Sequence, residues 1–128
     1  MQLKINKPLL KQKLKCYEKE INKYLVLYKT FISPTEAIYI LNILEKKYKI
    51  ISIPSFNFKS KWYGAWAHTD GRLKFRKKKL NILLVCHEYC HLICYKKGIK
   101  GHNRKFYKEL EKVINYIQKT LKYKITVK

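Results

Sequence analysis

The chain has 128 residues, 47% of them hydrophobic, and its 30 lysines and arginines against 8 acidic residues give a formal net charge of +22. This length suits one domain with a modest core and is too short for two. No stretch approaches the roughly 18 apolar residues of a membrane span, and the first residues lack the apolar region of a signal peptide, so we expect a cytoplasmic protein.

The N-terminal part is predicted to be helical. Apolar residues recur at helical spacing over Leu3–Tyr28, which indicates one long amphipathic helix with lysines on its other face. Ser33 and Pro34 are typical of a helix start, and Glu36 can complete a capping box. A second helix should therefore run to about Lys47.

The middle of the chain is predicted to form strands. β-Branched and aromatic residues alternate in part over Lys49–Phe58, where Pro54 indicates an edge or bulged strand. Lys61–Ala67 and Arg72–Phe75 are predicted to be the two arms of a hairpin that turns at residues 68–71. Together these segments predict a small, mostly antiparallel sheet of three strands.

An apolar helix predicted over Leu80–Tyr95 carries an H-E-x-x-H motif formed by His87, Glu88 and His91. Histidines four residues apart project from one helix face, where both can bind one zinc ion at about 2.0–2.1 Å. A carboxylate beside them can take a proton from the metal-bound water. Two histidines that are merely hydrogen-bonded in a core are the alternative, but burying them with a glutamate and no metal is costly. We expect Glu88 to be the catalytic base.

A third ligand should follow the motif. Gly98 can end the first helix, and Asn103 can cap another, so that His102 at its start can reach the open side of the metal. Glu109 and Glu111 remain alternatives, because some zinc hydrolases draw a glutamate ligand from the following helix.

The cysteines do not indicate a disulfide framework. Cys86, Cys90 and Cys94 recur every fourth residue along the predicted helix, and Cys16 is far away in the sequence. Reduced thiols, as in the cytoplasm, are expected.

The motif, the glycine-containing loop after it and the sequence Gly101-His102-Asn103-Arg104-Lys105-Phe106 resemble the SprT-like (Spartan-type) metallopeptidase domain. That family has H-E-x-x-H, a loop and then G-H-x-x-x-F. Residues 62–75 are similar to the strand pair that these domains place before the active helix, and the resemblance covers about Ile50–Lys119. Asn103-Arg104 departs from the small pair found in many members. The resemblance implies a zinc protease of the cytoplasm or nucleoid, often associated with DNA.

The net charge favours a polyanionic partner, because neutralised phosphates release counterions and give affinity without sequence specificity. The excess of lysine over arginine can also reflect an AT-rich coding sequence. The candidate phosphate contacts form a basic stretch before the active helix, namely Arg72, Lys74, Arg76, Lys77, Lys78 and Lys79; a solvated linker is the alternative. The candidates for lining a substrate cleft, or for stacking on bases, are Trp62, Tyr63 and Trp66.

Together these observations predict an α+β, zincin-like domain of about four helices and a three-stranded sheet, with a helical part at residues 1–48 and a catalytic core at 49–128. The predicted function is hydrolysis of peptide bonds, on DNA-associated proteins, with one zinc per chain. Tyr63, Tyr95 and Tyr107 are candidates for stabilising an oxyanion. A nucleic-acid-binding module with a structural zinc, and a zincin with a glutamate as third ligand, are the alternatives.

Overall fold

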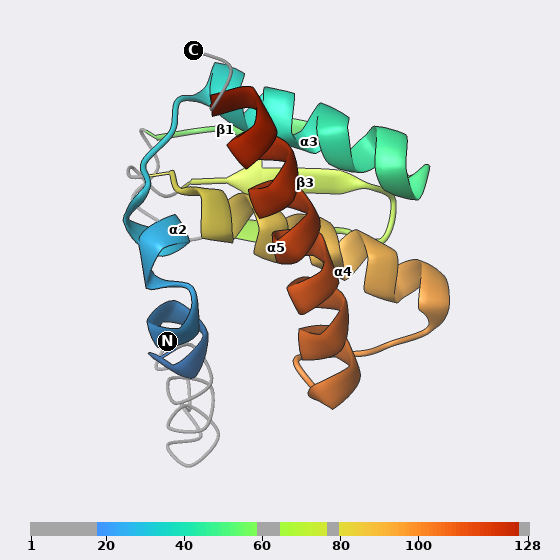
Figure 1. The fold of residues 1–128 in the computed structure, drawn as a ribbon. Helices are drawn as coiled ribbons and strands as arrows, with labels where there is room; N and C mark the ends of the chain where they lie inside the picture. Colours follow the sequence, from blue (N-terminus) through green and yellow to red (C-terminus); the bar gives the residue numbers. More distant parts are fainter. Residues whose placement is uncertain (1–17, 59–64, 77–79, 126–128) are drawn as a thin grey trace, which may run out of the picture.

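The computed structural model describes residues 18–58, 65–76 and 80–125, and it has the predicted α+β class (Figure 1). After a helical segment at residues 18–23, the elements in chain order are α2 (Leu25–Lys29), α3 (Pro34–Tyr48), β1 (Ile53–Phe56), β2 (Ala65–Ala67), β3 (Arg72–Phe75), α4 (Ile82–Lys97) and α5 (Arg104–Ile125).

The predicted N-terminal helix is present in its described part, but it is interrupted. Tyr24 leaves the helical conformation, with φ −119° and ψ 39°, and separates residues 18–23 from α2. The N–H of Tyr24 still donates to the C=O of Glu20, and the N–H of Tyr28 to the C=O of Tyr24, each at 3.0 Å. The two pieces therefore follow one another closely, and the break raises the number of helical segments above the predicted four. Residues 3–17 of the prediction lie outside the described residues.

Helix α3 starts as predicted. Ser33 Oγ accepts the N–H of Glu36 at 3.1 Å, and Glu36 Oε1 accepts the N–H of Ser33 at 2.9 Å. This capping box satisfies two donors at the helix start, and Pro34 has no N–H to satisfy there.

The sheet is mixed, so the prediction of a mostly antiparallel sheet was wrong. β2 and β3 pair antiparallel as the predicted hairpin, whereas β1 pairs parallel with β3, giving the order β1-β3-β2. A hairpin has a local turn signal in the sequence, but pairing between β1 and β3 depends on the path of the chain and has none. β1, which contains Pro54, is an edge strand as predicted. Gly71 must be glycine, since its φ is 98° and a Cβ would lie 3.0 Å from the C=O of Ile51.

Helix α4 lies at the centre of the fold. It contacts α2, α3, α5 and β2, and α5 crosses in front of it in Figure 1. Because neighbours surround it, α4 is apolar on almost every side, including the three cysteines, all buried and free. The inward face of the sheet contributes Leu73 and Phe75 to the same core.

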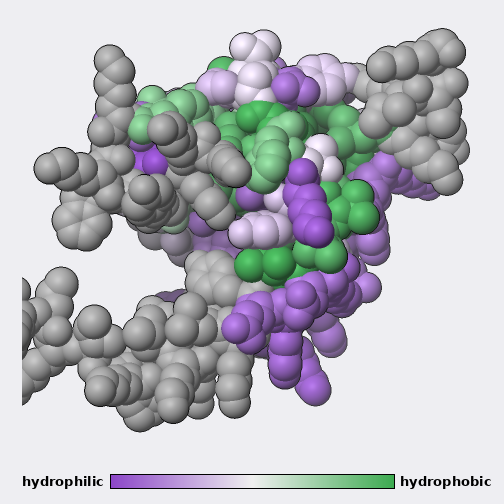
Figure 2. Space-filling model, turned by 90° about the vertical axis from the view of Figure 1, so that its left-hand side faces the viewer, coloured by the Kyte–Doolittle hydropathy of each residue, from purple (hydrophilic) through white to green (hydrophobic). Residues whose placement is uncertain are grey.

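The surface is not uniformly polar. The face that carries α2, seen in Figure 2, shows hydrophobic residues beside strongly hydrophilic ones. Val26 and Phe31, in and just after α2, are among the exposed apolar side chains of the structure. None of the described helices is both long enough and apolar enough to span a membrane.

Candidate metal centre

Capping at the start of α4 sets the position of the motif. Asn81 is buried at the N-cap, and its Oδ1 accepts the N–H of Leu84 at 2.8 Å. From this start, His87 and His91 occupy one face of α4, with ring centroids 5.1 Å apart. The helix ends at Gly98, which adopts the left-handed conformation with φ 74°.

The loop after α4 returns the chain to the same face. Gly101 also has a positive φ, of 70°, and reverses the chain just before His102. Asn103 then holds the loop from both sides: its Nδ2 donates to the C=O of Lys100 at 3.1 Å, and its Oδ1 accepts the N–H of Phe106 at 3.0 Å. This cap starts α5 and places His102 over the motif.

The three histidines converge through the same ring atom. His102 Nε2 lies 3.0 Å from His87 Nε2 and 3.1 Å from His91 Nε2. The three ligand atoms lie within 4.8 Å of one another. Among the histidine, cysteine and acidic side chains of the described residues, these three form the group that could hold a metal ion. The fully buried ring of Phe106 lies against all three imidazoles, with centroid distances of 4.6–5.0 Å.

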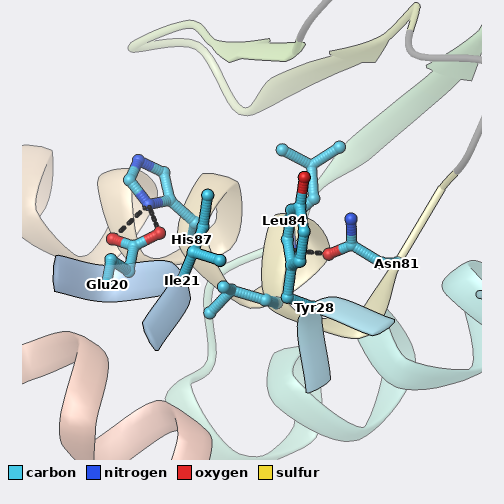
Figure 3. A pocket seen from close by; sticks show the side chains of 7 residues that line it. Glu20, Ile21, Tyr28, Asn81, Leu84 and His87 are labelled. Carbon is cyan, nitrogen blue, oxygen red and sulfur yellow. Dashed lines mark hydrogen bonds and ion pairs between the residues drawn. The ribbon is translucent and has the colours of Figure 1, made fainter. Parts of the chain in front are cut away.

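His87 has a second partner that the sequence did not reveal. Its Nδ1 lies 2.9 Å from both carboxylate oxygens of Glu20, in the helical segment at residues 18–23 (Figure 3). A carboxylate accepts a hydrogen bond here, so Nδ1 carries a proton, and Nε2 is the ring atom that faces the cluster and can bind a metal. No spacing rule connects residues 67 positions apart.

Hydrogen bonds account poorly for the contacts among the rings. One hydrogen on His102 Nε2 can satisfy only one of its two close contacts well. Burial, with the charges of the other two histidines, lowers the pKa of His91 to about 3, so His91 is a neutral acceptor at physiological pH. Three imidazole nitrogens that face one point, one of them on a ring fixed by a carboxylate behind it, form the donor set that zinc takes in an open site once the rings give up their Nε2 protons.

Glu88 lies beside this group without belonging to it. Its side chain is buried, and burial raises its pKa to about 7, with the charge of Glu20 adding to the rise and that of His87 opposing it. A carboxyl with this pKa can both accept and release a proton near neutral pH.

The structure also places the rival ligands. Glu109 is buried and receives Lys97 Nζ on its Oε1 at 2.8 Å, which links α4 to α5. Glu111 is exposed on α5. A thiol is also a zinc ligand in many sites, but Cys90 Sγ donates to the C=O of Phe106 at 3.7 Å. None of them joins the histidine group among the described residues, whereas His102 does.

Of the predicted nucleic-acid contacts, Arg72 and Lys74 lie in β3, alternating with the buried residues Leu73 and Phe75. The strand alternation puts Arg72 and Lys74 on the opposite face, where Trp66 pairs with Lys74 across the strands. The Arg76 guanidinium lies 4.8 Å from the centroid of the Trp66 ring. Trp66 thus lies with the basic residues. Trp62, Tyr63 and Lys77 to Lys79 are outside the described residues.

Two of the three candidate tyrosines are described. Tyr95 stacks on His91, with centroids 6.0 Å apart, and its hydroxyl donates to the C=O of Ala67 in β2 at 3.1 Å. Tyr107 packs edge-on against Phe106 at 5.4 Å. Tyr95 therefore connects the histidine face of α4 to the strand beside it.

Together the fold and the site define an α+β domain with a three-histidine cluster of metal-binding geometry, next to a buried glutamate. No protein-family model, curated protein or solved structure matches the chain. A proposal of function therefore has to rest on the motif residues and their arrangement.

Proposed function

We propose that this chain is a zinc-dependent metallopeptidase that holds one zinc ion with His87, His91 and His102 and uses Glu88 as its general base. The observation that carries the proposal is the convergence of three Nε2 atoms beside a buried carboxyl whose pKa is raised to about 7. A buried histidine pair alone would need neither a third histidine from another helix nor an adjacent glutamate.

The residues divide the chemistry between them. A zinc ion held by the three histidines would supply Lewis acidity for the scissile carbonyl and for a water molecule. Glu88 takes the proton that the attacking water loses and passes it to the departing amine. Phe106 holds the three imidazoles in place, and Tyr95 holds β2 against α4.

The outer edge of β2 is the proposed site for an extended substrate. The backbone N–H of His68 donates to the C=O of Arg72 at 2.9 Å, so the backbone groups of His68 point toward β3. The direction of the N–H and C=O groups alternates along an antiparallel strand, so those of Ala67 and Ala65 point away from β3, toward the open edge. The Tyr95 hydroxyl on the Ala67 carbonyl fits this direction. A peptide paired along this edge would gain main-chain hydrogen bonds with little side-chain selection.

The outer face of the sheet is the proposed contact for DNA. Arg72, Lys74 and Arg76 gather there with Trp66, and this combination of cations with an aromatic ring suits a phosphate backbone and stacked bases. This face favours substrates that are themselves bound to DNA. It would equally serve a nucleic-acid-binding module with a structural zinc, which makes that module the second candidate.

The test compares the wild type with Glu88→Gln, Glu111→Gln and His102→Ala. We expect one zinc per chain and casein cleavage in the wild type and in Glu111→Gln, zinc without cleavage in Glu88→Gln, and strongly weakened zinc binding in His102→Ala. Zinc retained by His102→Ala but lost by Glu111→Gln would favour the zincin with a glutamate ligand. Cleavage is assayed on casein and on DNA-bound protein, each with and without single-stranded DNA. Tightly bound zinc without cleavage in any of these assays would favour the nucleic-acid-binding module with a structural zinc.

A further inference from the structure

We propose that Glu20 is a positioning residue of the metal centre, and that through it the occupancy of the centre and the docking of residues 18–29 on α4 depend on each other. The inference rests on the proposed zinc site, and extends it from the three ligands to the N-terminal helical segment. It assigns no chemical step to Glu20.

The contact between Glu20 and His87 is short and sealed from solvent. Both carboxylate oxygens lie 2.9 Å from Nδ1, and the two side chains are only 4% and 3% exposed. The imidazole is thereby fixed in tautomer and in rotation, with Nε2 aimed at His91 and His102. A ligand held in this way loses little conformational entropy when it binds a metal.

The same carboxylate needs a positive charge nearby. An uncompensated buried carboxylate is strongly destabilising. A proton on the opposite nitrogen of the His87 ring can provide that charge in the metal-free protein, and a divalent cation held there would provide more of it through the imidazole. Metal binding should therefore stabilise the buried position of Glu20, and with it the helical segment that carries Glu20.

Two hollows border Glu20, so we expect its contact with His87 to contribute to docking the helical turns at residues 18–23. A pocket of about 100 Å³ lies between the segment and α4, and Figure 3 shows Ile21, Tyr28 and Leu84 around it together with Glu20 and His87. A second hollow of about 330 Å³ lies on the side of Tyr107. Leu27 in α2 is buried in the core, and Tyr24 and Tyr28 pack against it, so apolar contacts hold the end of the segment, whereas residues 18–23 meet α4 beside these two spaces.

Thermodynamic linkage makes the dependence reciprocal. If docking of residues 18–29 improves metal affinity by some factor, the metal improves docking by the same factor. Removing the carboxylate should break both effects. An exposed carboxylate on the same segment provides the control, and Glu18 is such a residue.

The experiment compares the wild type with Glu20→Gln, Glu20→Ala and Glu18→Gln. Zinc affinity is measured by competition with a chelator, and the Co²⁺ absorption spectrum reports the ligand geometry. We expect zinc affinity to fall about 10- to 100-fold in both Glu20 variants, with an altered Co²⁺ spectrum, and to stay at the wild-type value in Glu18→Gln. Circular dichroism of the metal-free proteins identifies a variant that has simply unfolded, and Glu20→Gln keeps the size and one acceptor oxygen of the original side chain.

Hydrogen exchange of residues 18–29 tests the reciprocal effect. Zinc should slow exchange there in the wild type and in Glu18→Gln, and much less in Glu20→Gln. Folded Glu20 variants with wild-type zinc affinity and spectrum would overturn the positioning role, and exchange that zinc does not change would overturn the coupling. A wild type that binds no zinc would overturn the proposed metal centre and this inference with it, which separates the two failures.

Discussion

Phe106 offers a test of whether the metal centre depends on the packing of its histidines. The ring is fully buried and contacts all three imidazoles and Tyr107. Phe75 in β3 is equally buried, and its stacked partner among the described residues is Phe56, at 5.4 Å. Phe106→Leu and Phe75→Leu therefore remove the same atoms from the core, but only the first removes them from the site.

Truncating a buried phenylalanine to alanine costs about 3–5 kcal/mol, and leucine refills roughly half of the space, so each variant should lose about 2 kcal/mol of unfolding free energy. With an m-value of about 1–3 kcal/mol/M, the urea midpoint of the metal-free protein should fall by roughly 1 M in both. Zinc affinity, measured by chelator competition, should fall about tenfold in Phe106→Leu and stay unchanged in Phe75→Leu. Equal zinc affinities in the two variants would refute the idea that Phe106 holds the histidines in register.

Three further predictions follow from the caps, the buried carboxyl and the thiols. Ser33→Ala and Asn103→Ala should each cost about 1 kcal/mol in urea unfolding, since each removes a helix cap, but only Asn103→Ala should also weaken zinc binding, because it frees the loop of His102; unchanged zinc affinity in Asn103→Ala would contradict this. Burial raises the pKa of Glu88 from 4.5 to about 7, so the contribution of Glu88 to the stability of the metal-free protein should be fully present below about pH 4.5, and roughly 3 kcal/mol of it should be lost as the pH rises through 7. Urea unfolding at several pH values should show a difference in unfolding free energy between the wild type and Glu88→Gln that changes by this amount across the range, and a difference independent of pH would disprove the raised pKa of Glu88. Burial raises the pKa of Cys86 to about 12, so iodoacetamide at pH 8 should alkylate it only as fast as the protein unfolds; rapid labelling of the folded protein would show that this side chain is accessible.

The features that the sequence predicted are those with a local cause. The capping box at Ser33 and the caps at Asn103 and Gly98 are encoded within a few residues, and the structure has all three. The convergence of His102 on the motif was also predictable, because a short loop between two helices leaves few paths for the chain.

The features that the sequence did not predict depend on the tertiary path. The parallel pairing of β1 with β3 is set by the route of the chain between them. Glu20 lies among lysines on a predicted amphipathic helix, where a solvated carboxylate is the ordinary expectation. Only docking of that helix on α4 brings it to Nδ1 of His87. The break in the helix at Tyr24 was likewise not predictable, because no proline or glycine marks it in the sequence.

X-ray absorption at the zinc K-edge tests the central claim most directly, because it reports the atoms bound to the metal in the intact protein. We predict a first shell of nitrogen and oxygen at about 2.0–2.1 Å, with imidazole scattering from three histidines and no sulfur. A sulfur shell at about 2.3 Å would contradict the account, since it would mean a cysteine-ligated zinc with a closed coordination sphere.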